Sequence, residues 1–207
     1  MIIHQFDSNI VSVIDTQGIH FTGVAKTYPA EYGLHEFGRE EDSLELNGFQ
    51  IFESDIAEIN DMPSFTIIRA TKTWQQAGAY YVRIQAMAKK HNISLRQEFD
   101  EHDTPDTKYI VVTDNDFPVA TARMYPIDEN HMMIGRVVVL PEYRGRGLGT
   151  MVVSECEKWA EEQGFSHAVV DSRDNKTAFY EFMGYEITGG KACCSDTFQC
   201  IRMEKEL

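Results

Sequence analysis

A glycine-rich segment that follows a valine-rich run is the part of the sequence best suited to hold a phosphate group. The run Val137–Leu140 ends at Pro141, and Arg144-Gly145-Arg146-Gly147-Leu148-Gly149-Thr150 leads into a helical pattern. Glycine lets a backbone turn tightly and bring its N–H groups close to a ligand, and a helix N-terminus adds unpaired donors with partial positive charge. Arg144 and Arg146 either contact phosphate oxygens or face water. The segment predicts a binding loop for a phosphate-bearing ligand.

Two common phosphate-binding motifs do not fit this loop. A Walker A loop ends in Gly-Lys-Ser/Thr, whereas Gly149 precedes Thr150 without a lysine. A dinucleotide fingerprint has the pattern Gly-x-Gly-x-x-Gly, and Gly145, Gly147 and Gly149 have a different spacing. Glycines also mark ordinary turns, so the loop alone does not identify its ligand.

The loop and the segments around it together resemble the GNAT superfamily of acyl-CoA-dependent N-acyltransferases. Arg144-x-x-Gly147-x-Gly149 matches the pyrophosphate-loop pattern Gln/Arg-x-x-Gly-x-Gly/Ala. Residues Asn175–Tyr185 are similar to the family helix Asn-x-x-Ala-x-x-Phe/Tyr-Tyr-x-x-x-Gly-Phe/Tyr, with one residue fewer before the aromatic pair. The resemblance covers residues 65–207. Within it, Arg96–Asp103 and Ile201–Met203 look like the ElaA-type branch.

The resemblance implies a central mixed, splayed sheet flanked by helices, acetyl-CoA as the acyl donor, and a primary amine of a small molecule or peptide as the acceptor. The amine would attack directly in a ternary complex. Loop amides would cradle the pyrophosphate, and unpaired groups of the valine strand would receive the pantetheine amides. Asn175 is also expected to cap the helix that follows it. The implied donor-binding residues are Val137, Val138, Val139, Arg144, Gly145, Arg146, Gly147, Leu148, Gly149, Thr150 and Asn175.

The resemblance also implies roles for two proton-transferring groups. Tyr180 stands where the family places a general acid, because a phenol with a pKa near ~10 can donate to a thiolate of comparable basicity. The alternative for Tyr180 is a core aromatic position beside its Phe neighbours. A general base must take a proton from the substrate ammonium, and Glu98 is the first candidate. The others are Asp100, Glu101, His102 and Asp103, although an acidic run usually faces solvent.

Cysteines and histidines give no sign of another chemistry. Cys156, Cys193, Cys194 and Cys200 form no Cys-x-x-Cys pair and have no nearby histidine, so we expect free, mostly structural thiols in a reducing cytoplasm. An acetyl-cysteine intermediate is therefore disfavoured. The histidines, His131 and His167 among them, show no zinc-ligand spacing, so we expect no bound metal.

Composition and charge restrict the partners. The chain has 207 residues, 43% of them hydrophobic, and a net charge of −14. Residues 1–66 hold two basic and twelve acidic side chains. Nucleic acid needs clustered Lys and Arg, and a membrane span needs roughly 20 apolar residues, so neither partner is expected. We expect a cytoplasmic protein whose acidic cluster attracts a cationic amine.

Two modules are expected, divided at residues 61–64. Residues 1–64 read as a small, acidic, β-rich module similar to an Sm/SH3-like barrel, and residues 65–207 as a mixed α/β (α+β) domain. The expected strands cover residues 10–14, 19–24, 44–46, 49–52, 56–59, 65–69, 109–113, 119–125, 132–140, 168–171 and 198–203. The expected helices cover residues 73–90, 147–163 and 176–183, with a further helical turn over 92–99. Residues 32–42 are expected to form a loop.

Other functions remain open at this point. A non-catalytic protein could keep the CoA site, or serve as a protein-interaction module through its acidic N-terminal residues. RNA binding by an Sm-like module is disfavoured by the charge of that region. If the chain self-associates, a homodimer is the commonest symmetric assembly.

Overall fold

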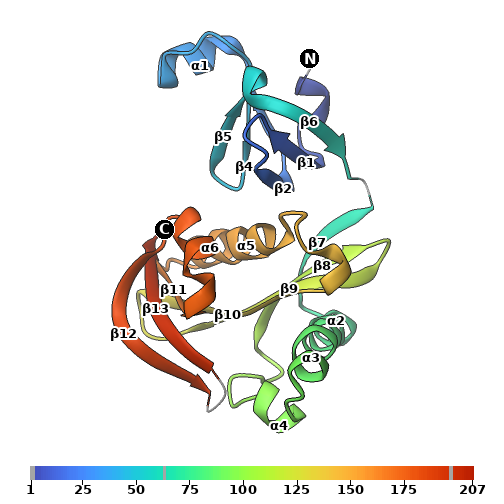
Figure 1. Ribbon diagram of the computed structural model, residues 1–207, viewed down its shortest axis with the longest axis vertical. Helices are drawn as coiled ribbons and strands as arrows, with labels where there is room; N and C mark the ends of the chain where they lie inside the picture. The colour runs from blue at the N-terminus through green and yellow to red at the C-terminus, as the bar shows by residue number, and fades with distance from the viewer. Residues whose placement is uncertain (1–2, 63, 196–197) are drawn as a thin grey trace.

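Two small sheets and one large sheet make up the protein (Figure 1). The computed structural model describes residues 3–62, 64–195 and 198–207, and their side chains except those of 190–195 and 198. Pro63, part of the expected boundary, and the side chains of Cys193 and Cys194 lie outside this description. Within it, no helix is long and apolar enough to cross a membrane.

The N-terminal residues form two three-stranded antiparallel sheets with the orders β2-β1-β6 and β3-β4-β5. Alternating apolar residues of the strands, such as Val11, Val13, Leu44 and Leu46, are fully buried in a core of their own. This confirms that the region is rich in β-structure, while the Sm/SH3 likeness stays a prediction. The strands are β1 Ile10–Asp15, β2 His20–Val24, β3 Lys26–Tyr28, β4 Ser43–Leu46, β5 Phe49–Phe52 and β6 Ile56–Asp61.

The loop expected over residues 32–42 is wrong at its start, because Ala30–Phe37 forms helix α1. Gly38 ends the helix with a φ of 71°, and its N–H reaches the Gly33 and Leu34 carbonyls. The first amide of the helix, that of Ala30, donates to the Asp42 carboxylate at 2.8 Å. This cap comes from twelve residues further along the chain, so a search for a preceding capping residue could not find it.

A seven-stranded mixed sheet forms the rest of the protein, in the order β12-β13-β11-β10-β9-β8-β7. Its only parallel pair among the described residues is β10–β11. The mixed α/β class is therefore confirmed. The strands are β7 Phe65–Arg69, β8 Lys108–Asp114, β9 Phe117–Pro126, β10 His131–Val139, β11 His167–Arg173, β12 Glu186–Ser195 and β13 Phe198–Glu206.

Helices cover both faces of this sheet (Figure 1). Helix α5 packs on β8, β9 and β10 from one side with α6 beside it, and α2 packs on β8 and β9 from the other. The apolar face of α5 explains this packing, since Leu148, Val152 and Cys156 are almost completely buried. Burial of Leu148 and of Val152 stabilises the fold by roughly 1.5–3 kcal/mol each. The helices are α2 Thr73–Arg83, which continues through a π-turn Ile84–Ala88 into α3 Lys89–His91, then α4 Leu95–Glu98, α5 Leu148–Glu162 and α6 Thr177–Phe182.

The C-terminal hairpin departs from expectation in two respects. Strand β12 was not predicted, because its register shift between Ile187 and Lys191 falls on glycines that read as a turn. Cys200 is disulfide-bonded, so the expectation that every cysteine is free is wrong; Cys156 is free and buried. Within the hairpin, Ala192 pairs with Cys200.

Strands β10 and β11 separate after a short ladder. Their parallel pairing covers His131↔His167 to Met133↔Val169 and stops there. On its other side, β10 has a register shift between Gly135 and Val138, where Arg136 has a φ of 51°. The C-terminal half of β10 is thus left without a strand partner toward β11. The site described next lies at this opening in the sheet.

Candidate functional site

The glycine loop offers a row of free backbone donors. Gly145 and Gly147 have φ values of 76° and 74°, in the left-handed region that favours glycine, and Gly147 is the N-cap of α5. Within the described chain, none of the N–H groups from Gly145 to Thr150 donates to a protein acceptor, and the next amide, that of Met151, bonds the Gly147 carbonyl at 3.1 Å. The arrangement suits an anion held by main-chain amides.

A cleft of about 980 Å³ runs from this loop along the free half of β10. This volume is typical of a small-molecule site. Basic side chains also line the cleft, among them Lys90, Arg144 and Lys176, in a chain that is acidic overall. Of the expected site residues, those lining it are Val137, Val138, Val139, Arg144, Gly145, Gly147, Leu148, Gly149, Thr150, Tyr180 and Glu98.

Arg146 and Asn175 are not among the lining residues. The Arg146 guanidinium lies over the Tyr143 ring, 5.0 Å from its centroid, whereas Arg144 lines the cleft and its Nε donates to the Val139 carbonyl at 3.2 Å. The expected cap is wrong for Asn175: Lys176 is the N-cap of α6, and Asn175 belongs to the exposed 3₁₀ turn Asp174–Lys176. That turn starts the helix one residue later than the motif suggests.

Tyr180, which belongs to α6, lines the cleft. Its side chain is 9% exposed and packs edge to face against Phe179 and Tyr185. Among the described residues, no hydrogen bond engages its hydroxyl. Burial raises the pKa of Tyr180, so the phenol keeps its proton throughout the physiological range. Tyr180 is thus both a core aromatic and a protonated donor facing the cleft.

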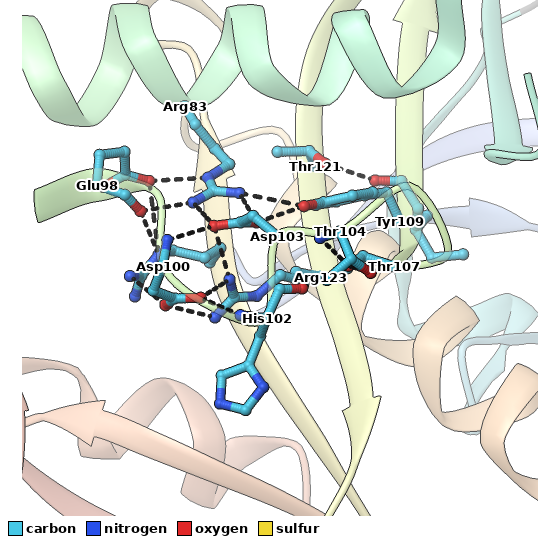
Figure 2. A network of polar contacts seen from close by, with 12 residues as sticks. Arg83, Glu98, Asp100, His102, Asp103, Thr104, Thr107, Tyr109, Thr121 and Arg123 are labelled. Carbon is cyan, nitrogen blue, oxygen red and sulfur yellow. Dashed lines mark hydrogen bonds and ion pairs between the residues drawn. The ribbon is translucent and has the colours of Figure 1, made fainter. Parts of the chain in front are cut away.

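A buried ionic network (Figure 2) contributes Glu98, Asp100 and Arg123 to the lining of the cleft. Arg83, fully buried, donates to Glu98 at 2.8 Å and to both Asp103 oxygens at 2.6 and 3.0 Å. Tyr109 also donates to Asp103. The network places two carboxylates of the acidic run in the interior, where charged groups are found only when paired.

Asp100 extends the network to the cleft surface. Both its oxygens are bound by Arg123, at 2.6 and 3.0 Å, and Arg136 contacts it at 2.9 Å. Three arginines thus face the carboxylates of Glu98, Asp100 and Asp103. The expected attraction of a cationic amine by this cluster is weakened, because the charges cancel in pairs.

The same contacts decide which carboxylates are basic. Burial favours the protonated forms of Asp100 and Asp103, but Arg123 and Arg83, respectively, outweigh it and leave the pKa of each carboxyl below its ordinary value. Both are therefore poor proton acceptors at neutral pH. His102 lines the cleft with its ring stacked on Tyr125 at 3.8 Å between centroids, and Glu101 is exposed.

The N-terminal sheet packs directly on the glycine loop. Thr22 of β2 is fully buried, and its hydroxyl donates to the Arg146 carbonyl. A Cβ placed on Gly147 would lie 2.7 Å from the Thr22 nitrogen. Phe182 of α6 stacks on Phe49, with 4.7 Å between ring centroids. Residues that precede position 65 therefore shape the glycine loop, and His20 of the same strand lines the cleft.

Sequence reasoning missed the arginines Arg83, Arg123 and Arg136 as well as Thr22. One signal was available for the arginines. An acidic run that has apolar neighbours in the sequence needs cationic partners if it is buried. Nothing in the local sequence indicates which arginines these are. Thr22 carries no signal, because its contact joins residues 124 positions apart.

Comparisons with known proteins agree with this geometry. The model of the acetyltransferase (GNAT) family matches residues 69–185, more than half of the chain. A crystal structure described as that of a candidate N-acetyltransferase from Lactobacillus plantarum is similar, with 32% identity and a TM-score of 0.66, over 70% of this chain and 99% of that one.

More distant structures share the fold. Escherichia coli ElaA has 21% identity and a TM-score of 0.57, over 69% of this chain and 98% of its own. A GNAT family acetyltransferase from Elizabethkingia anophelis, solved with acetyl-CoA bound, has 15% identity and a TM-score of 0.51, over 70% of this chain and 99% of that one.

Proposed function

The chain belongs to the GNAT family of acetyltransferases, and from this premise we propose that it transfers the acetyl group of acetyl-CoA to a primary amine of a small molecule or peptide. The observation that carries the proposal is the row of free N–H groups from Gly145 to Thr150 at the start of α5. Such donors match a diphosphate, and the cleft continues from them along the half of β10 that has no partner toward β11, as a pantetheine arm requires.

The residues present fit acetyl-CoA. We propose that the amides of Gly145–Thr150 hold its diphosphate and that main-chain groups of Val137–Val139 hold its amides. Arg144 supplies a cation beside the loop, while the side chains of Arg146 and Asn175, residues that do not line the cleft, have a peripheral part. When bound, acetyl-CoA supplies an acetyl thioester that an uncharged amine can attack.

We propose that two side chains lining the cleft transfer the protons. Tyr180 donates its phenolic proton to the departing sulfur, since its raised pKa keeps it protonated. Of the candidate bases, His102 lines the cleft with its ring stacked on Tyr125, so we propose that it accepts the proton of the ammonium. Glu98 remains the alternative, and to accept a proton it must give up part of its contact with Arg83 at 2.8 Å.

Calorimetry with acetyl-CoA, followed by thiol release against a panel of primary amines, tests the proposal. We expect saturable binding of one equivalent and thiol release with at least one amine. Absence of binding contradicts the whole proposal. Binding without release from any amine favours the alternative, a non-catalytic CoA-binding or interaction protein.

Gly147→Ala is expected to weaken acetyl-CoA binding by more than about tenfold, roughly 1.4 kcal/mol. The new Cβ meets the Thr22 backbone at 2.7 Å, and the φ of 74° is strained for alanine, so the loop must shift. Calorimetry measures the change. Gly164→Ala is the matched control, because Gly164 also has a positive φ, 90°, but nothing lies within 4 Å of its Cβ position. Equal effects of both variants would contradict a role for the loop geometry.

His102→Gln is expected to lower kcat/KM by about 10²-fold or more. The stacked ring on Tyr125 positions the base, and glutamine cannot accept a proton. Steady-state kinetics with the best amine of the panel measure the loss, and the exposed His35→Gln is the control. If Glu98→Gln causes the loss instead while His102→Gln does not, Glu98 is the base.

We also propose that residues 1–64 act as a docked module of the enzyme and not as an independent binding unit. The support is the contact of Thr22 with the loop and the stacking of Phe49 on Phe182.

A further inference from the structure

Three polar side chains converge on the large sheet at the end of β10 that lies away from the glycine loop. His131 and His167 are the first residues of β10 and β11, and the parallel ladder pairs them directly. Glu204 comes from β13, the neighbour of β11 on its other side. All three side chains are partly exposed, at 30%, 34% and 27%. Two imidazoles and a carboxylate thus meet at a position that solvent can reach.

The distances between these groups fit a small tetrahedral metal ion. One ligand atom from each residue lies within 4.8 Å of the other two. Glu204 Oε1 is 3.4 Å from His131 Nε2 and 3.9 Å from His167 Nε2. Tetrahedral zinc with bonds of about 2.0–2.1 Å keeps its ligand atoms roughly 3.3 Å apart. Small side-chain adjustments therefore suffice to complete the coordination.

The Nδ1 atom of each imidazole ring is hydrogen-bonded, as is typical of histidines that bind a metal through Nε2. His131 Nδ1 lies 2.8 and 3.0 Å from the two oxygens of Asp128, and His167 Nδ1 lies 2.8 Å from the Ser166 hydroxyl. Asp128 is itself fixed, because its Oδ1 accepts the amides of Asn130 and His131 at 2.8 and 2.9 Å. Such outer contacts orient the ring and leave Nε2 to face the shared point.

We propose that His131, His167 and Glu204 bind a divalent transition-metal ion, with zinc as the best match. Imidazole nitrogen favours zinc over magnesium or calcium, which prefer oxygen ligands. Three protein ligands leave a fourth position for water. The ion would stabilise the short β10–β11 ladder at its first residue pair, before the two strands separate. The residues are 36 and 37 positions apart in the chain, so no ligand spacing in the sequence indicates the site.

The alternative occupant of this position is a proton. Hydrogen bonding to Asp128 raises the pKa of His131, so a protonated ring can pair with Asp128 and Glu204 without any metal. Metal binding must displace that proton, which makes it stronger at pH 7.5 than at pH 5.5. A metal-bound site and a protonated site can therefore be told apart by how Zn²⁺ affinity depends on pH.

Titration of tag-free, EDTA-treated full-length protein with Zn²⁺, and separately with Co²⁺, tests the proposal. We expect one saturable Zn²⁺ site by calorimetry, the visible absorption of tetrahedral Co²⁺, and a higher Tm with Zn²⁺ than with EDTA. Excess Mg²⁺ or Ca²⁺ should not compete. Absence of saturable binding, or competition by Mg²⁺, overturns the proposal.

Variants assign the ligands. His167→Ala and Glu204→Gln are expected to lower Zn²⁺ affinity by more than about 100-fold, and Asp128→Asn by about 10–100-fold. His4→Ala is the matched control, since His4 also contacts a carboxylate, Asp42, at 3.0 Å, and should leave binding unchanged. Circular dichroism and Tm in EDTA establish that each variant is folded. Unchanged affinity in folded His167→Ala overturns the assignment.

Discussion

Tyr180→Phe is expected to lower kcat by about 10²–10⁴-fold while leaving the affinity for acetyl-CoA nearly unchanged. The substitution removes one hydroxyl from a ring that is otherwise packed among aromatics, so the wall of the cleft keeps its shape. Only the proton donor for the leaving sulfur is lost. Steady-state kinetics and calorimetry on the same preparation measure the two quantities.

Tyr143→Phe is the matched control for this experiment. Tyr143 also lines the cleft, but its hydroxyl bonds Asp114 at 3.0 Å, so its loss should leave kcat almost unaffected. Because burial raises the pKa of Tyr180, wild-type activity should not fall between pH 8 and 10 through loss of this proton. An unchanged kcat in Tyr180→Phe would cancel the acid role.

Arg83→Met should lower the free energy of unfolding by about 3–5 kcal/mol. Arg83 is completely buried and bonds Glu98, Asp103 and the Glu98 carbonyl, so its removal leaves two buried carboxylates without their main partner. Urea unfolding followed by circular dichroism measures the loss. Arg96→Met is the control, because Arg96 is exposed at a short helix and should change stability by less than about 0.5 kcal/mol.

The same network predicts how stability depends on pH. The pKa of Asp103 is lowered in the folded state, so its contribution is present above the unfolded value of about 3.9 and is lost as pH falls below it. Wild-type stability should therefore decline steeply below pH 4. If Arg83→Met keeps the wild-type stability, or shows the same acid-dependent loss, the network does not stabilise the fold. Should that variant fail to fold, Arg83→Lys keeps the charge, loses the forked contacts and should show a smaller loss.

Features that depend on local sequence could be predicted. Glycine at positive φ, an apolar strand ended by Pro141 and an amphipathic helix are all written in neighbouring residues, so the loop and α5 were expected at nearly their observed positions. The resemblance added the separation of β10 from β11, which the ladder confirms by ending at Met133↔Val169.

Features that depend on distant partners could not be predicted. Helix α1 is capped by Asp42, which follows it, and the acidic run around Asp103 is neutralised by arginines from α2 and β9. In each case the sequence shows one half of an interaction as an unexplained acidic residue. The pairing of His131 with His167 belongs to the same class, since it depends on strand register alone.

The hydrogen bond from Thr22 to the Arg146 carbonyl limits where the protein can be divided into fragments. A fragment trimmed to the boundaries of the matched family region would lose the contact of Thr22 with Gly147 and leave more of the Phe182 ring exposed to water. If acetyl-CoA binds to this loop as proposed, thermodynamic reciprocity requires that its binding also stabilise the docking of the N-terminal sheets on the loop. Separation of the N-terminal sheets from the loop would then cost part of the binding free energy of the proposed donor.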